Sequence, residues 1–334
     1  MRTKVLGLLI ILFSFFSGWF WMDYQSSLND PVIIDQAITF EIKKGQSFNT
    51  ISNNLERQKV LIKPFWFKVI AYQKGYTQKL QAGEYTLKPG LTAVALLQMF
   101  SSGKTRNHSI TFLEGWTFKQ IKQAITEHPY LTHSIEGLSD AEILAQLGAA
   151  IQNPEGQFYP DTYFFDKNML DTSLLQRAYS KMQSILAEEW SGREKGLPLK
   201  NAYQALILAS IVEKETGDGL ERPQIAGVFI RRLRKGMLLQ TDPTVIYGMG
   251  KNYKGNIRLQ DLKKPTPYNT YVIKGLPPTP IAIPGRDAIH AVLHPDKGKS
   301  LYFVAKGNGS HKFSATLKEH NHAVDVYQRK RKVK

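Results

Sequence analysis

Hydrophobic and polar positions follow several patterns along the chain, and the first is one long apolar run. Residues 5–22 carry no charged side chain and are rich in leucine, isoleucine, phenylalanine and tryptophan. A helix of this length and composition is just long enough to span a bilayer. Basic residues precede the run at positions 2 and 4, whereas residues 23–42 carry acidic but no basic side chains. The positive-inside rule therefore predicts that residues 1–4 form a cytoplasmic tip.

A cleaved signal peptide is the alternative interpretation of the apolar run. Signal peptidase needs small residues directly after such a run, but the first alanine of the chain is Ala37. We therefore expect a single-pass anchor at residues 5–22 in a bacterial inner (plasma) membrane, followed by a linker at residues 23–36. The rest of the chain then lies on the periplasmic or extracytoplasmic side.

Residues 37–103 have the pattern of a small mixed domain. The alternation and capping signals predict a strand at residues 37–43, a helix at 47–57, a helix at 65–72 and a strand at 82–87. This order resembles the LysM carbohydrate-binding module, although the similarity is one of order and size. A generic spacer domain is the alternative, because a fold alone does not define a function.

Residues 104–328 alternate longer helical patterns with short strands, so the fold class that we expect is α+β. A strand at residues 108–113 precedes helices at 117–127, 139–150, 170–190, 201–216 and 224–234. Segments rich in proline, glycine, hydroxyl and aromatic groups follow at residues 240–248, 266–271 and 275–285. Such segments predict irregular loops of the kind that line clefts for polar ligands.

Charge and composition narrow the possible partners. The 334 residues include 44 lysines and arginines against 28 acidic residues, a formal net charge of +16, and no cysteine. The lack of cysteine excludes disulfides, thiolate metal sites and a cysteine nucleophile. A basic surface attracts nucleic acid, anionic lipid or an acidic polymer, and the predicted topology favours the membrane and the cell wall over nucleic acid. The basic tail at residues 329–334 fits these partners, and an inert solvated tail explains it equally well.

Rings, amides and carboxylates gather in the irregular segments. Aromatic rings can stack on the apolar face of a sugar while neighbouring polar groups bind its hydroxyls. Core packing of the same rings is the alternative. The candidates for substrate binding are Tyr159, Asp161, Tyr163, Gln240, Thr241, Asp242, Tyr268, Asn269, Thr270 and Tyr271.

One carboxylate stands out on the predicted helix at residues 201–216. At about 100° per residue, Glu215 falls about 20° from Leu208, in the middle of the apolar face. Glu213 falls about 140° from Leu208, so we expect it to be the expendable glutamate. Burial and the negative end of the helix dipole both raise the pKa of a carboxyl, and a protonated carboxyl is what a general acid needs. A frayed last turn that exposes Glu215 to water is the alternative.

Several motifs then resemble one family. The chain is similar to the membrane-bound endolytic murein transglycosylases, the YceG-like family, in the segments Ala209–Thr216, Leu239–Val245, Tyr268–Tyr271, Gly275–Pro278, Leu301–Ala305, His311–Phe313 and His320–Asn321. These motifs occur in order, and the resemblance covers essentially the whole chain. One position departs from the pattern: Thr279 stands where glycine is frequent, which puts the fine geometry of that turn in doubt.

The resemblance implies a lyase that acts on peptidoglycan, with Glu215 as its catalytic residue. Members cleave the β-1,4 bond between N-acetylmuramic acid and N-acetylglucosamine in nascent strands without water, leave 1,6-anhydro ends and so terminate elongation. The implied partners are glycan strands, the inner membrane, peptidoglycan synthases, and division or elongation proteins. Two alternatives stay open: a non-catalytic peptidoglycan-binding scaffold, and a hydrolytic muramidase with Asp161 or Asp242 as second carboxylate.

A metal or cofactor is not expected. His290 and His294 have the i, i+4 spacing of a helical metal pair, but the sequence gives neither the glutamate of the zinc-protease motif nor a defined third ligand. A cap or core role is therefore the better interpretation of the two histidines.

Overall fold

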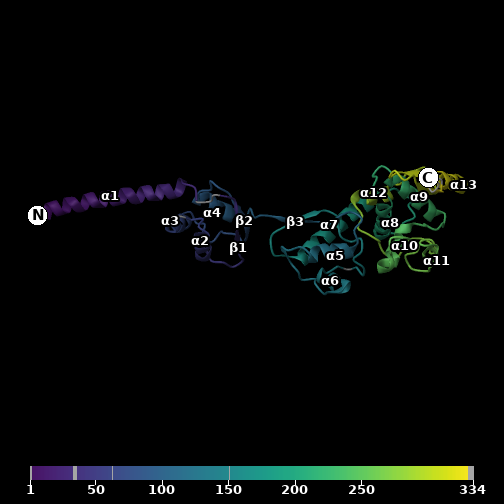
Figure 1. The fold of residues 1–334 in the computed structure, drawn as a ribbon, viewed down its shortest axis with the longest axis horizontal. Helices are drawn as coiled ribbons and strands as arrows, with labels where there is room; N and C mark the ends of the chain where they lie inside the picture. The colour runs from purple at the N-terminus through teal and green to yellow at the C-terminus, as the bar shows by residue number, and fades with distance from the viewer. Residues whose placement is uncertain (1, 33–35, 62, 150, 330–334) are drawn as a thin grey trace. The chain divides into compact units, whose positions relative to one another are not determined.

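The computed structural model of the chain (Figure 1) describes residues 2–32, 36–61, 63–149 and 151–329. It divides into two compact units. Unit 1 comprises Met1–His108 and Phe164–Asn168, and unit 2 comprises Ser109–Tyr163 and Met169–Lys334. The tail at residues 330–334 lies outside the described residues.

Unit 1 begins with the predicted apolar helix, α1 (Arg2–Asn29). Within Lys4–Asn29, an 18-residue stretch reaches a mean hydropathy of 2.1, and α1 is the one helix among the described residues with the length and composition of a membrane span. The helix continues past residue 22 to Asn29, so the first residues of the expected linker are helical, and the bounds of the linker stay a prediction. Asp23 accepts hydrogen bonds from Lys63 and Trp66, which hold this last part of the helix. Residues 33–35 of the expected linker lie outside the described residues.

The small domain of unit 1 has the predicted order of elements. It consists of β1 (Ile38–Ile42), α2 (Phe48–Arg57), α3 (Pro64–Gln73), β2 (Gly83–Leu87) and α4 (Ala93–Ser102). β1 and β2 pair antiparallel, with Phe40 opposite Tyr85, and both rings are buried against Phe100. The hydroxyls of Ser47 and Thr92 cap α2 and α4.

A short return segment completes unit 1. Lys167 donates to Glu41 at 3.0 Å and to Glu84 at 2.9 Å. The second Glu84 oxygen lies 2.7 Å from His108 Nε2. Burial opposes ionisation of Glu84, but these two partners hold its pKa below the usual value.

Unit 2 combines many helices with two-stranded sheets, so the expected mixed α+β class is confirmed. Its elements are β3 (His108–Thr111), α5 (Phe118–Thr126), β4 (Leu131–Thr132), α6 (Asp140–Gln146), β5 (Thr162–Phe165), β6 (Met169–Leu170), α7 (Asp171–Ser191), α8 (Ala202–Glu215), α9 (Arg222–Arg234), α10 (Asp242–Met249), α11 (Leu259–Lys263), α12 (Arg286–Leu293), β7 (Tyr302–Ala305), β8 (His311–Ser314) and α13 (Leu317–Val324), with short η1 (Gly250–Asn252) and η2 (Asp325–Arg329). β3 pairs with β5, β4 with β6 in parallel, and β7 with β8 antiparallel.

The core of unit 2 is a group of helices around α8. α7, α9, α10 and α12 all contact α8, and Figure 1 shows α8, α9 and α12 side by side. The apolar face of α8 runs from Ala205 to Val212, and it packs with Phe229 of α9 and Val292 of α12. This packing fixes the direction of the last turn of α8.

The expectation of an irregular loop at residues 240–248 was wrong, because α10 occupies most of it. Asp242 stands in the first turn, and Pro243 occupies a position that tolerates proline because no hydrogen-bond donor is needed there. Thr244 and Val245 are buried against the helices around α8. Residues 242–248 are therefore helical instead of forming an irregular loop.

Candidate active site

Glu215 is the last residue of α8 and the centre of the candidate site. The buried apolar face of α8 brings it to a partly buried position, where the Thr241 hydroxyl donates a hydrogen bond to its Oε1 atom. The N-terminal end of the same helix is capped by Asn201, whose side chain accepts from the Gln204 amide at 2.9 Å. Thr241 fixes Oε1, which leaves Oε2 as the oxygen that can carry a proton to a substrate.

The surroundings of Glu215 favour its protonated form, so that a substantial fraction of the carboxyl carries a proton near neutral pH. Burial raises the pKa of Glu215 to about 7, and the negative charge of Asp242 acts in the same direction. The hydrogen bond from Thr241 and the positive charges of His311 and Arg232 lower the pKa but do not outweigh burial. A carboxyl of this kind is suited to donate a proton and to take one back.

Three buried threonines form the floor beneath Glu215. The Thr241 amide donates to Thr270 Oγ1 at 3.0 Å, and the Thr244 and Thr270 hydroxyls lie 2.9 Å apart. Gln240, directly before Thr241, has φ of +51°, a left-handed conformation that is strained for a residue other than glycine. The Gln240 amide donates to the Thr270 carbonyl at 3.1 Å, and this bond helps to hold the strained residue in place.

A carboxylate and a tyrosine lie beside this floor. The Tyr271 hydroxyl donates to Asp242 Oδ1 at 2.6 Å. Burial and the negative charge of Asp242 both raise the pKa of Tyr271, so this hydroxyl keeps its proton at neutral pH. Asp242 itself is exposed, so it can meet a ligand directly.

Arg232 is a site residue that the sequence did not reveal. It is buried on α9, where Nε donates to the Leu301 carbonyl at 2.7 Å and Nη1 to the Leu239 carbonyl at 3.0 Å. Its guanidinium lies 5.1 Å from the centre of the Tyr302 ring, and its positive charge acts on Glu215. A cation so placed stabilises Glu215 in the ionised form that follows proton transfer.

Histidines from the C-terminal part of the chain also reach this region. His311 Nδ1 lies 2.7 Å from Glu221 Oε2, and the His311 amide donates to the other Glu221 oxygen at 2.9 Å. His320 stacks on Tyr302 with ring centres 5.2 Å apart, and burial lowers its pKa. Both histidines belong to motifs that carry the family resemblance, and this was their only signal in the sequence.

Glu213 points away from Glu215 and has a different environment, as its place off the centre of the apolar face predicted, and that it is expendable for cleavage stays a prediction. It accepts from Arg222 Nη2 and from the Gly285 amide, both at 3.0 Å, and its side chain is 5% exposed. Burial raises the pKa of Glu213, while Gly285 and Arg222 oppose that shift. The helical projection did not reveal these partners, because it contains α8 alone, whereas Arg222 comes from α9.

Among the described residues, no contact joins the candidates Tyr159, Asp161 and Tyr163 to Glu215. Asp161 pairs with Lys181, and the Lys181 ammonium also lies 5.0 Å from the centre of the Tyr159 ring. Tyr163 is 4% exposed and packs on Phe112, with ring centres 5.3 Å apart. The core interpretation therefore describes Tyr163, while Tyr159 and Asp161 form a separate group with α7.

The candidates Tyr268, Asn269 and Thr270 support the site from beneath. Asn269 and Thr270 are buried, so they position other groups instead of facing solvent. The Tyr268 hydroxyl lies 2.8 Å from Thr279 Oγ1. Thr279 thus fills the position where the family pattern has glycine, and its hydroxyl also donates to the Pro280 carbonyl at 2.8 Å.

A second buried carboxyl lies next to this segment. Glu155 is 5% exposed, accepts from the Phe118 amide at 2.9 Å and from the Tyr247 hydroxyl at 3.0 Å. Burial raises its pKa to about 7. The Tyr247 ring in turn lies 4.9 Å from that of Tyr268, so Glu155 anchors α10. Its sequence signal was weak, because a carboxylate between proline and glycine reads as part of a turn.

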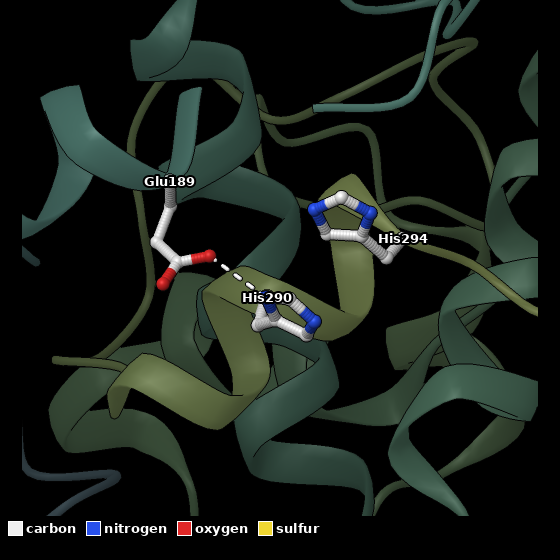
Figure 2. A group of neighbouring side chains, drawn as sticks. All are labelled: Glu189, His290 and His294. Atoms are coloured by element: carbon white, nitrogen blue, oxygen red, sulfur yellow. Dashed lines mark hydrogen bonds and ion pairs between the residues drawn. The ribbon is translucent and has the colours of Figure 1, made fainter. Parts of the chain in front are cut away.

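Figure 2 shows the two helical histidines with a third group that the sequence did not offer. Glu189 of α7 lies beside His290 of α12 and His294, the residue directly after that helix, with potential ligand atoms all within 4.8 Å of one another. The Glu189 oxygens already bond to Arg286 Nε at 2.6 Å and to His290 Nδ1 at 2.8 Å. The group is therefore an ion-pair network that joins α7 to α12, and the expectation that no metal binds stays a prediction.

Comparisons with known proteins agree on one family. The chain matches the YceG-like family over residues 40–326. An endolytic murein transglycosylase of Bacillus subtilis (strain 168) is 36% identical over 325 residues, which cover 91% of this chain and 89% of that protein. An endolytic murein transglycosylase of Streptococcus pneumoniae serotype 2 is 27% identical, and the match covers 91% of this chain and 61% of that protein. A crystal structure of a YceG-like protein from Listeria monocytogenes matches 86% of this chain and 99% of its own, with 31% identity and a TM-score of 0.55.

Proposed function

Because the chain belongs to the YceG-like family, we propose that it is an endolytic murein transglycosylase that cleaves the β-1,4 bond between N-acetylmuramic acid and N-acetylglucosamine without water. The single observation that carries this proposal is Glu215, a partly buried carboxyl with a pKa of about 7, held by Thr241 at the end of a rigid helix. The curated relatives of 36% and 27% identity carry the name endolytic murein transglycosylase.

The proposed reaction needs one acid that later acts as a base. Glu215 Oε2 donates its proton to the glycosidic oxygen, and the bond from that oxygen to the muramic anomeric carbon breaks. The 2-acetamido group of the substrate stabilises the positive anomeric carbon. The ionised Glu215 then takes the proton of the 6-hydroxyl, whose oxygen closes the 1,6-anhydro ring. The proton returns to Glu215, and no water is consumed.

The charged neighbours of Glu215 favour different protonation states of its carboxyl during this cycle. Asp242 favours the protonated Glu215 that begins the reaction, and Arg232 favours the ionised Glu215 of the intermediate. Because both charges act on one carboxyl, neither proton transfer is strongly uphill. Thr241 keeps that carboxyl in a fixed orientation throughout.

A hydrolytic muramidase is the second candidate, and Asp242 is the observation that favours it. Its exposed carboxylate lies close enough to Glu215 to raise the pKa of that residue. Hydrolases use such a second carboxylate to activate water or to form a covalent intermediate. The two reactions differ in the end that they leave on muramic acid.

Mass spectrometry of the products separates the two reactions. Full-length protein in detergent should convert uncrosslinked glycan strands into fragments that end in 1,6-anhydro-N-acetylmuramic acid. The same digestion in H₂¹⁸O should place no ¹⁸O in the new ends, because the 6-hydroxyl replaces water. Reducing muramic ends that carry ¹⁸O would contradict the transglycosylase proposal and favour the muramidase.

The pH dependence of cleavage tests the role of Glu215 as an acid. Activity should fall as the pH rises through its pKa of about 7, because the proton to be donated is lost. Asp242→Asn removes a negative charge that raises this pKa, so the alkaline limb should move to lower pH by up to about one unit. Asp161→Asn is the matched control, because Asp161 pairs with Lys181, and should leave the limb in place. A limb that stays or moves upward in Asp242→Asn would contradict the assignment.

The location of the enzyme follows from α1 as a proposal. An anchor with a cytoplasmic tip at residues 1–4 places unit 2 on the periplasmic or extracytoplasmic side of the inner membrane, where glycan strands are made. The β-α-α-β order of unit 1 supports a LysM-like module beside the membrane. A reporter fused to the C-terminus, active only outside the cytoplasm, tests this orientation.

A further inference from the structure

A polar cavity of about 340 Å³ lies next to α10, and its lining does not include Glu215. One wall comes from Val245, Gly248 and Met249 at the C-terminal end of α10. The opposite wall comes from the segment that contains η1 and α11. That segment contributes the cations Lys254, Arg258 and Lys264, the amides Asn252, Asn256 and Gln260, and the carboxylate Asp261.

The cations of the cavity are available to a ligand. Lys254, Arg258 and Lys264 are exposed, and within the described ranges none of them forms an ion pair with an acidic side chain. The single carboxylate of the lining, Asp261, accepts the Arg258 backbone amide at 2.9 Å. Three cations against one carboxylate give the cavity a positive potential, which favours anionic ligands.

The cavity is rigidly joined to the site around Glu215. α10 starts at Asp242 and reaches the cavity at Val245, and at about 1.5 Å per residue its far end is about 10 Å away. Asn269 provides a second link. Its buried amide donates to the carbonyls of Asp261, Leu262 and Lys264 at 2.8–3.1 Å, while its neighbour Thr270 bonds to Thr241.

The substrate of the proposed reaction carries anionic groups at this distance from the scissile bond. Each N-acetylmuramic acid bears a peptide on its lactyl group, and that peptide has free carboxylates. An extended peptide of about five residues reaches up to about 17 Å. A muramic acid bound beside Glu215 can therefore place its peptide carboxylates in the cavity.

We propose that this cavity binds the carboxylates of the stem peptide on the N-acetylmuramic acid next to the cleaved bond. The proposal rests on the proposed function, since it assigns a second contact to the same substrate. The enzyme then distinguishes peptide-bearing strands from strands whose peptides have been removed. Its cleavage sites follow the peptide content of the wall.

The test compares two substrates on one enzyme. Uncrosslinked strands are used as synthesised or after an amidase has removed their peptides, and kcat/KM is measured for each with full-length protein in detergent. We expect the wild type to prefer the peptide-bearing strands, and Lys254→Ala with Arg258→Ala to reduce this preference about tenfold, the loss of about 1.4 kcal/mol of binding. Lys119→Ala with Lys195→Ala, two exposed lysines outside the cavity, should keep the wild-type preference.

The outcomes distinguish this proposal from the proposed function. A wild type with no preference, or a cavity variant that keeps the full preference, would overturn the stem-peptide site while the anhydro ends would still stand. Thermal unfolding of both double variants checks that they fold. The anion could instead be a phosphate, so inorganic phosphate and phosphatidylglycerol vesicles are added as competitors. If either competitor abolishes the activity of the wild type but not that of Lys254→Ala with Arg258→Ala, while peptide removal has no effect, the cavity is a phosphate site and the proposal is wrong.

Discussion

Glu215→Gln should lower the rate of glycan cleavage by about a thousandfold or more. Glutamine still accepts the Thr241 hydrogen bond, but it cannot donate a proton to the glycosidic oxygen or take one from the 6-hydroxyl. General acid–base catalysis contributes about 10²- to 10⁴-fold, and this residue performs both transfers. The measurement is the initial rate of release of muramic fragments from uncrosslinked strands.

Two further measurements on the same variant test whether Glu215 is the catalytic residue rather than a structural one. Its melting temperature should equal or exceed that of the wild type, because glutamine removes a carboxyl whose ionised form is disfavoured by burial. Cosedimentation with peptidoglycan should also persist. A Glu215→Gln protein that cleaves at the wild-type rate would overturn the assignment, and wall binding without any cleavage by the wild type would favour the non-catalytic scaffold.

Glu213→Ala should lower the free energy of unfolding by about 1.5–3 kcal/mol, because Arg222 loses its closest partner and keeps only the longer contacts to Glu114 at 3.4 Å and Asp287 at 3.6 Å. The Gly285 amide also loses its acceptor. Full-length protein in detergent should therefore unfold at a lower urea concentration. At low temperature, where the variant is folded, its products should still end in anhydro rings.

A double variant is the control for this effect. Glu213→Leu with Arg222→Met removes both charges and replaces them with apolar groups, so it should recover much of the lost stability. Equal stability of Glu213→Ala and the wild type would show that the Arg222 pair contributes nothing. A loss of cleavage in Glu213→Ala as complete as in Glu215→Gln, at full folding, would instead remove the distinction between the two glutamates.

The sequence predicted most of what depends on local periodicity. The order of strands and helices in unit 1 follows from alternation and caps within short windows, and Ser47 caps the helix that was predicted at residues 47–57. Glu215 also emerged from local geometry, because the period of one helix placed it among apolar residues. Its pKa and its partner Thr241 needed the structure.

The missed residues belong to contacts between distant segments. Arg232 acts on Glu215 only because α9 packs on α8 and the chain near residue 301 supplies a carbonyl for its guanidinium. No periodic pattern in the sequence encodes a contact between such distant segments. The partner of Glu213 was missed for the same reason, since a single-helix projection does not contain the helix that brings Arg222.

The helix α10 was missed although its signals were present. Asp242 and Pro243 are typical of a first helical turn, but the polar and aromatic residues around them favoured a loop. Tertiary packing favours the helix over a loop, because Thr244 and Val245 are buried in the core. Likewise, the sequence left open whether Tyr163 stacks on a sugar or packs in the core, and in the structure its ring is part of the core.

The return segment Phe164–Asn168 has a consequence for evolution and for chimeras. Unit 1 is not one continuous stretch of chain, because Lys167 comes from between two parts of unit 2 and binds Glu41 and Glu84. A chimera that takes only residues 37–103 from another protein would receive new acidic residues at this place without the lysine that pairs with them. Transplants of residues 37–103 should therefore succeed only when residues 164–168 travel with them, and exchange of the two parts during evolution should be subject to the same constraint.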